Sequence, residues 1–558
     1  MNDKAVSIAA LIVLVVVGVV AVLLSVYAQS VSWRFLLAFY PLLVILFGVA
    51  LMRQSGLRMA SVGLVVTIVL AVLQFGTSFE VALGASVYGF VKSFGISVSV
   101  AGTMLMVFLM KETGALQTVS KVIKAQVVGN EVMALYIGVG FGSFLSALGV
   151  VTPALFPPLL VAMGFSPTAA IAIAVLGYDP TTSFSLLSIP ITLPAQVGAL
   201  NAIELAFRIA IFLPLVSTGF AFAILWLVGG RQSMARGAIP AVVCGVTLAL
   251  GCLGPVSLDY FTGVEYVPLR IVGVVAGLCA MASLLVYQKL RPTAREVKKA
   301  TDYPARGEIL RAFSPWIMLT SLAVVVSVPL VGSWLSNVLG GLEKMKIFAN
   351  QEIDFDVLAQ IYTWIFVAVS LSLLTLRVKR NEAKKAFSVW VRRAAGPFLT
   401  YSLYFSVSYV MADSAMQIVD GSLMPLASPN SLNMNVVLGA TLAAAFGVGY
   451  VFVAASLGLF GAVVGGSETS SNVLFLSIQK TAMHELKLDS SFMTVYGSHA
   501  VGGGIASAVT PAKINNAVAT IDAGKETESL IMRKHMIVAV LLTVATGIMT
   551  GILVNVGL

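Results

Sequence analysis

The sequence predicts an all-α protein that crosses a membrane many times, and its composition and its apolar runs are the reasons. Only 10% of its 558 residues are charged and 59% are hydrophobic, whereas soluble domains carry about 25% charged residues. Apolar runs recur at the roughly 20-residue length that a membrane-spanning helix needs. With less regular stretches they predict about 12 to 14 crossings or half-crossings. The clearest runs cover 5–27, 35–51, 59–75, 96–110, 209–229, 267–287, 315–338, 357–376 and 535–557.

Basic residues gather in two predicted loops, 289–312 and 377–396. Two predicted crossings separate these loops, so both lie on one side of the membrane. Cytoplasmic loops carry an excess of Lys and Arg, which makes that side the cytoplasm. The formal net charge of +10 would suggest nucleic-acid binding in a soluble protein. Because membrane topology explains it here, we expect a lipid bilayer and no nucleic acid as a partner.

The longest polar connection, 289–313, separates two membrane halves, 1–288 and 314–558. Each half contains a similar segment, at about 132–200 and about 450–522. In both segments an apolar arm meets a Gly-rich break, returns, passes a short polar link and reaches a second polar break. Interrupted hydrophobic segments at matching places in two halves indicate a transporter built from inverted repeats. We therefore expect each repeat to hold a re-entrant hairpin and an interrupted helix.

The stretch GGSETSSN, residues 465–472, puts polar side chains into a very apolar neighbourhood. Irregular backbone at the depth of the hydrocarbon must be buried in protein or line a cavity. The amides that open a returning half-helix carry partial positive charge and suit an anion. We expect two such hairpin tips to face one binding site. Their predicted substrate-binding residues are Gly149 and Thr152 in the first half, and Gly466, Ser467, Thr469, Ser470, Ser471 and Asn472 in the second.

Two acidic residues fall within these polar breaks. Asp179 ends an apolar arm, and Glu468 lies in the second tip. A carboxylate inside the membrane is costly unless it is paired or protonated, so both residues are candidates for proton coupling. The alternative is that each one caps the helix that follows it. A permanently charged Glu468 would repel an anion, so it should be protonated when substrate is bound.

The second half supplies further ionisable candidates. Lys513 could bind a carboxylate substrate or neutralise Glu468 or Asp179. His499 could relay protons near neutral pH, but a lone His in such a segment is more often part of a hydrogen-bonded structure. The remaining predicted substrate-binding residues are Thr181 and Thr182 in the first half and Asn515 in the second.

Several stretches resemble the L-lactate permease family: GSETSSNVLF, TPAKINNAVATIDAGKETESLIMRKH and FGSFLSALGVVTP. The resemblance implies a prokaryotic inner-membrane protein that carries L-lactate or a related 2-hydroxy monocarboxylate, such as glycolate, together with protons. It also implies two inverted repeats, an elevator-type movement by alternating access, and no cofactor. A homodimer is compatible with such a fold.

Other functions remain open at this point. The same fold could couple to sodium and carry a dicarboxylate or a sulfonate, with Asn472 and Asp179 among the ligands of the ion. An anion channel is a further alternative, although two interrupted repeats suit alternating access better. An enzyme is disfavoured, because the three His and three Cys form no metal-ligand spacing. The sequence also lacks the motifs HExxH, GxSxG and GxxxxGK[ST].

Overall fold

The computed structural model describes most of the chain. The predicted first transmembrane helix, 5–27, and the predicted site residues Thr152, Gly466 and Asn515 lie outside the described residues. The described residues are 31–50, 52, 54–149, 153, 156–177, 179–290, 303–338, 344–426, 432–465, 467–510, 513–514, 517–518, 521, 523 and 525–558.

The first half is helical, with several short helices between residues 130 and 210. Its elements are α2 (Val31–Ala50), α3 (Gly56–Gln74), α4 (Phe79–Lys92), α5 (Phe94–Glu112), α6 (Ala115–Gln126), α7 (Asn130–Leu135), the π-helix η1 (Tyr136–Phe141), α8 (Gly142–Ala147), α9 (Phe156–Ala162), α10 (Pro167–Leu176), the 3₁₀ turns η3 (Thr182–Phe184) and η4 (Leu186–Ser188), α11 (Ile189–Val197), α12 (Ala202–Ala210), α13 (Leu213–Arg236), α14 (Ala238–Thr262) and α15 (Leu269–Lys289).

The second half is also mainly helical and adds two short hairpins. Its helices are α16 (Arg306–Ser327), α17 (Pro329–Val338), α18 (Ile361–Thr375), α19 (Arg380–Ala412), α20 (Met434–Phe446), η6 (Gly447–Gly449), α21 (Tyr450–Gly465), α22 (Glu468–Glu485), η7 (Asp489–Ser491), α23 (Phe492–Ile505), η8 (Ala506–Val509) and α25 (Lys525–Asn555). Its strands are β1 (Lys344–Phe348), β2 (Gln351–Asp354), β3 (Met416–Val419) and β4 (Ser422–Pro425).

Within the described residues, eight helical stretches are long and apolar enough to cross a bilayer. One of them, Met434–Val463, runs through the break at η6. Shorter apolar helices cover Trp33–Gly48, Pro167–Leu176, Leu186–Val197 and Ile361–Thr375. The prediction of an all-α polytopic membrane protein is therefore confirmed.

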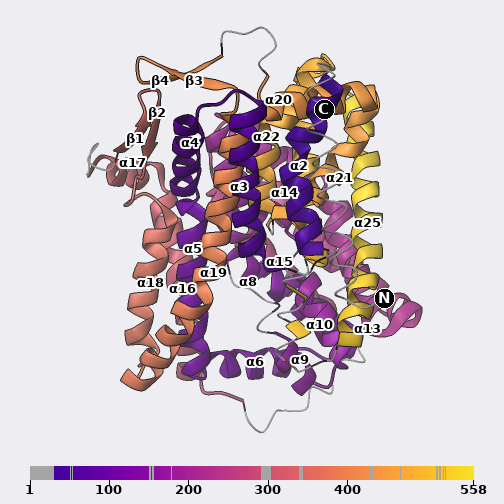
Figure 1. Ribbon diagram of the computed structural model, residues 1–558. Helices are drawn as coiled ribbons and strands as arrows, with labels where there is room; N and C mark the ends of the chain where they lie inside the picture. The colour runs from indigo at the N-terminus through magenta and orange to yellow at the C-terminus, as the bar shows by residue number, and fades with distance from the viewer. Residues whose placement is uncertain are drawn as a thin grey trace.

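The two antiparallel hairpins, which the sequence did not predict, lie at the same end of the molecule (Figure 1). They are joined by backbone and side-chain hydrogen bonds. Ala349 N–H donates to the Gly421 carbonyl at 2.8 Å, and the Asn350 amide bonds the Leu423 backbone in both directions, at 2.9 and 2.8 Å. In Figure 1, α6 lies across the opposite end, so the long helices run between these two layers.

The basic stretch 377–396 was expected to be a loop, and this prediction is wrong for most of it. Helix α19 already begins at Arg380 and continues to Ala412. The Glu382 side chain accepts a hydrogen bond from the Lys379 backbone N–H at 2.8 Å and so caps the helix start. Ala, Lys, Arg and Glu are also good helix formers. The basic charge therefore lies on the first turns of a helix.

Helices α21 and α23 cross at close range and position the second polar tip. A Cβ atom at Gly458 would lie 1.8 Å from the His499 carbonyl oxygen, and one at Gly502 would lie 1.9 Å from the Ala455 carbonyl oxygen. No other residue fits at such distances, so these glycines set the helix spacing. Helix α22 packs against both helices as well as against α20.

Candidate functional site

The first-half break begins directly after α10 and contains unusual backbone. Asp179 and Pro180 lead into η3 and η4, and the chain becomes a regular helix again at Ile189. Neighbouring helices hold this segment: Ser217 Oγ donates to the Pro180 carbonyl at 2.6 Å, and Ser188 Oγ donates to the Leu269 carbonyl at 2.8 Å. Left-handed φ angles, which strain residues other than Gly, occur at Thr182 (42°), Leu186 (51°), Leu187 (54°) and Ser188 (58°).

Polar atoms of this break are buried without hydrogen-bond partners among the described residues. The hydroxyls of Thr181 and Thr182 make no hydrogen bond, and neither carboxylate oxygen of Asp179 has a partner at good hydrogen-bond geometry, although the Ser507 hydroxyl lies close to this carboxylate. Asp179 is 1% exposed. The Asp179 side chain therefore does not cap the following turn. Buried polar groups without partners are rare in native proteins and often mark a place where a ligand or water binds.

The second tip is more completely bonded. Ser467 caps α22, because its hydroxyl accepts a hydrogen bond from Ser470 N–H at 3.1 Å and also pairs with Ser470 Oγ at 2.9 Å. Ser471 Oγ donates to the Gly458 carbonyl at 3.2 Å. The Thr469 hydroxyl is the exception, since it is buried without a partner in the described chain. The tip is thus a preformed helix start, and the first amides of a helix have no partner within that helix.

The two breaks touch each other although they are almost 300 residues apart. Ser183 Oγ donates a hydrogen bond to the Glu468 carboxylate, and Asn472 Nδ2 donates to the Pro190 carbonyl at 2.9 Å. A Cβ atom at Gly504, in α23, would lie only 2.6 Å from Thr182 Cβ. The first break therefore packs into the angle between the start of α22 and the end of α23.

Lys513 joins this cluster from the segment that follows η8. Its Nζ donates to Ser507 Oγ at 2.6 Å. It also interacts electrostatically with both Asp179 and Glu468. The centre of the protein thus contains two acids and one cation, of which the acids are 1% and 7% exposed. Such charges are tolerated in a membrane interior only when they face one another or a polar cavity.

His499 lies beside the tip and both of its ring nitrogens are engaged. Gln479 Nε2, a donor, lies 3.0 Å from Nδ1, so Nδ1 accepts and Nε2 carries the proton. Nε2 in turn lies 3.2 Å from Ser471 Oγ. The ring packs against Phe475 and Tyr496, at centroid distances of 5.3 and 5.9 Å. These contacts favour the interpretation of His499 as a structural residue that supports the tip.

The structure brings most of the predicted residues together and adds some that the sequence did not single out. Ser507 and the glycines Gly503 and Gly504 belong to the cluster, but Ser and Gly are too common in membrane helices to stand out in a sequence. Gly149 occupies a different place: a Cβ there would meet Thr103 Cγ2 at 2.9 Å and Leu186 Cδ2 at 3.3 Å. It borders the first break from the side of η4.

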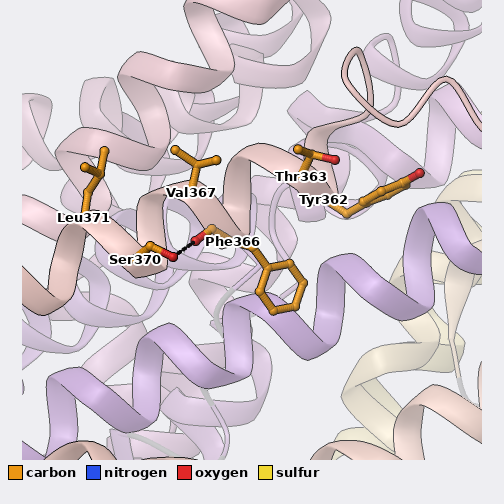
Figure 2. A pocket seen from close by; sticks show the side chains of 6 residues that line it. All are labelled: Tyr362, Thr363, Phe366, Val367, Ser370 and Leu371. Atoms are coloured by element: carbon orange, nitrogen blue, oxygen red, sulfur yellow. Dashed lines mark hydrogen bonds between the residues drawn. The ribbon is translucent and has the colours of Figure 1, made fainter. Parts of the chain in front are cut away.

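A groove with a volume of about 470 Å³ lies elsewhere, along one face of α18 (Figure 2). It bears no acidic or basic side chain, and Ser370 Oγ bonds the Phe366 carbonyl of its own helix at 2.9 Å. Such a surface suits the apolar phase of a membrane and lacks the groups that would hold an anion. Its lining residues are Tyr362, Thr363, Phe366, Val367, Ser370 and Leu371.

The central cluster can bind a small anion and can exchange protons. The α22 amides and Lys513 supply positive charge, the unpartnered hydroxyls supply donors and acceptors, and the two acids can each take up a proton. No group of His, Cys, Asp or Glu suited to a metal ion is found among the described residues.

Comparison with known proteins shows similarity over nearly the whole chain. The L-lactate permease from Salmonella typhimurium is 25% identical over 530 residues, which cover 88% of this chain and 91% of that protein. The L-lactate permease from Bacillus subtilis is 25% identical over 547 residues, with the same shares. The glycolate permease GlcA from Escherichia coli is 24% identical over 576 residues, covering 93% of this chain and 97% of that protein.

These relatives are permeases, which indicates a transporter rather than an enzyme. Together with the eight apolar helices, they indicate a multi-pass protein of the cell membrane. A family model described as L-lactate permease matches residues 34–557. The chain therefore belongs to the L-lactate permease family.

Proposed function

We propose that this protein takes up L-lactate or a related 2-hydroxy monocarboxylate, such as glycolate, by proton symport with alternating access. The relatives named L-lactate permease and glycolate permease support the substrate class. The observation that carries the proposal is the buried meeting of two helix breaks with unpartnered polar atoms between them. Such breaks at one depth are typical of transporters whose substrate binds near the middle of the membrane.

Charge balance supports proton coupling. With Asp179 and Glu468 ionised and Lys513 charged, the cluster has a net charge of −1, and a bound monocarboxylate would add another negative charge. Repulsion between like charges is strong in a poorly solvated site. Proton uptake by one of the acids removes that repulsion, so the anion and the proton bind better together than separately. The proposed proton-coupling residues are Glu468 and Asp179, with His499 next in line.

The proposed substrate contacts surround this charge cluster. Lys513 and the first amides of α22 bind the carboxylate, while the hydroxyls and Asn472 bind the remaining polar group. The full proposed set is Gly149, Thr152, Thr181, Thr182, Gly466, Ser467, Thr469, Ser470, Ser471, Asn472, Lys513 and Asn515. Of these, Thr181, Thr182, Thr469 and Asn472 each have a buried polar atom without a partner in the described chain, which supports their assignment.

The proposal extends to the movement of the two halves and to the oligomeric state of the carrier. The segments 132–200 and 450–522 are proposed to form inverted repeats that move as one transport unit in an elevator-type movement. The connection 289–313 would join the two halves on the cytoplasmic side of a prokaryotic inner membrane. A homodimer of this chain is proposed as its working form.

The proposal is tested in proteoliposomes with an imposed pH gradient and no sodium. The wild type should accumulate labelled lactate or glycolate, with an apparent affinity that rises by up to about tenfold per pH unit as the pH falls. Glu468→Gln mimics the protonated acid. It should keep substrate exchange, lose accumulation, and bind with a flattened pH dependence between about pH 5 and 8.

Glu485→Gln provides a matched control, because Glu485 is exposed at the far end of the same helix. This variant should accumulate substrate as the wild type does. Uptake that requires sodium would replace proton coupling with the sodium-coupled alternative. Flux that equilibrates substrate without ever concentrating it would indicate a channel. If the substrate affinity of Glu468→Gln depends on pH as steeply as that of the wild type, the proton site is Asp179 or His499 instead.

A further inference from the structure

The Asn472 side chain is held in one orientation. Its Nδ2 donates to the Pro190 carbonyl at 2.9 Å, and its backbone carbonyl accepts a hydrogen bond from the Tyr496 hydroxyl at 2.7 Å. Turning the amide over would place Oδ1 against the Pro190 oxygen, where two acceptors would repel each other. The hydrogen bond therefore fixes Oδ1 as the end of the amide that points away from Pro190.

This Oδ1 atom is buried and makes no hydrogen bond within the described chain. Asn472 itself is 0% exposed. An amide oxygen can accept a hydrogen bond but can never donate one. Whatever satisfies this atom must therefore bring a donor hydrogen or a cation. The carboxylate of a bound anion brings neither.

A glycine of α23 lies beside this oxygen. The nearest glycine, Gly503, would place a Cβ atom 3.5 Å from Asn472 Oδ1 and 3.2 Å from Glu468 Cγ. A side chain at Gly503 would press against Glu468, so glycine lets α23 pack closely against both residues. Ser183 reaches Glu468 from the other break, so these residues lie at the junction of the two halves.

We propose that Asn472 Oδ1 accepts the hydrogen bond of the C2 hydroxyl and thereby selects 2-hydroxy acids over 2-oxo and unsubstituted acids of the same length. The inference rests on the proposed function, since it assumes that a monocarboxylate occupies this cluster. With the carboxylate bound by Lys513 and the α22 amides, C2 is the next atom along the substrate. Its substituent is the one that can reach an acceptor beside Gly503.

Lactate, propionate and pyruvate each have three carbon atoms, so comparing them distinguishes recognition of the C2 hydroxyl from selection by substrate size. Lactate brings a donor to Oδ1, propionate brings none, and pyruvate brings a second acceptor that Oδ1 repels. A site that binds a hydroxyl with a buried acceptor strongly rejects analogues that lack it. The expected order of affinity is therefore lactate, then propionate, with pyruvate weakest, although pyruvate is no larger than lactate.

The test measures affinities of the full-length protein for lactate and propionate at one pH, without sodium, for wild type and Asn472→Ala. In the wild type lactate should bind about 10- to 100-fold more tightly than propionate. In Asn472→Ala this ratio should fall close to one, mainly through weaker lactate binding. A purely structural role would weaken both substrates by the same factor and leave the ratio unchanged, which would overturn the proposal.

Asn435→Ala is the matched control. Asn435 lies on α20, donates through Nδ2 to Ser477 at 2.7 Å, and also has a buried Oδ1 without a partner in the described chain. It lies outside the cluster, so its ratio of lactate to propionate affinity should equal that of the wild type. An equal collapse of the ratio in Asn435→Ala would show that the effect is not local and would contradict the assignment.

Two results separate this inference from the proposed function. A wild type that transports none of these acids refutes the proposed function, and the assignment of Asn472 with it. A wild type that transports lactate by proton symport but binds propionate or pyruvate equally well refutes the assignment of Asn472 alone, even if Asn472→Ala does not fold. Substrate binding that requires sodium in the wild type, and that Asn472→Ala weakens equally for lactate and propionate, would instead assign Oδ1 to a cation and overturn the proposal.

Discussion

The two helix breaks that meet in this protein differ in how well their own polar groups are satisfied. In the second tip, Ser467, Ser470 and Ser471 bond one another or neighbouring backbone, whereas the Thr469 hydroxyl and Asn472 Oδ1 have no partner in the described chain. In the first break, Asp179 and Thr181 have buried oxygens with no hydrogen bond in the described chain. The first break also carries left-handed φ angles at four consecutive or nearby residues, from Thr182 to Ser188.

This difference indicates separate roles for the two breaks. A bonded helix start holds its shape without a ligand, so the second tip offers a fixed set of amides and a cap. Strain and unpartnered polar atoms persist only where the surrounding structure enforces them, and they concentrate at functional sites. The first break should therefore depend more on its ligand, and substitutions there should alter transport more than stability.

The largest effect is expected from Asp179→Asn. The amide brings the net charge of the cluster from −1 to zero and leaves Lys513 beside Glu468, so the protein should still reach the membrane with unchanged or higher thermal stability. Accumulation of substrate under a pH gradient should be lost, because the coupled uptake of one proton supplies about tenfold accumulation per pH unit of gradient and the variant cannot take up that proton at residue 179. Substrate uptake and the amount of the variant protein in the membrane are measured on the same preparation. The control is Asp489→Asn, because Asp489 is exposed and pairs with His484. Normal accumulation by Asp179→Asn would show that Asp179 has no role in coupling.

Gly504→Ala should have the next largest effect, because it separates the two breaks. The added Cβ would lie 2.6 Å from Thr182 Cβ and 3.0 Å from Thr182 Cα. Such overpacking costs about 1–3 kcal/mol, and uptake should fall by about tenfold or more because the site widens. The melting temperature and the uptake rate are compared with those of Gly254→Ala, where an added Cβ would meet no atom within 4 Å. Unimpaired uptake in Gly504→Ala would show that this contact does not set the geometry of the site.

Thr181→Val separates the effect of an unpartnered hydroxyl on stability from its effect on transport. Removing a buried hydroxyl without a partner should leave the free energy of unfolding unchanged or raise it by about 1 kcal/mol. Ser471→Ala removes a bonded hydroxyl and should lower it by about 1 kcal/mol. Substrate affinity should fall about tenfold in Thr181→Val. Thermal melts and uptake assays on both variants check this, and a destabilised Thr181→Val would mean that its hydroxyl is bonded in the protein.

The smallest effect is expected from Ser467→Ala in the second tip. The variant loses the cap of α22, which contributes about 1 kcal/mol, but it loses no charge. Substrate affinity should therefore weaken by a few-fold at every pH from about 5 to 8, with the pH slope of the wild type. A changed slope in this variant would connect the cap to the proton site and would contradict the division between the two breaks.

Composition alone determined that the chain lies in a membrane and is helical. Water cannot solvate so much apolar surface, and backbone groups in hydrocarbon must bond within the same segment. The polar stretch 465–472 and the acid at 179 also stood out in the sequence, because polar residues inside a membrane are costly and therefore rare in long apolar runs. The basic stretch 377–396 was wrongly predicted to be a loop, since charge predicts solvent exposure and says little about whether the exposed residues are helical.

Only the tertiary structure decided which polar groups meet. The contact between Ser183 and Glu468 and the approach of Gly504 to Thr182 join residues from different halves, and no local pattern encodes such pairs. The same holds for the hydrogen bonds of His499, which use both ring nitrogens. Helix propensity and hydropathy act over a few turns of chain, whereas the partner of a buried polar atom depends on how distant helices pack. The unpartnered Oδ1 of Asn472 could be recognised only once that packing was known.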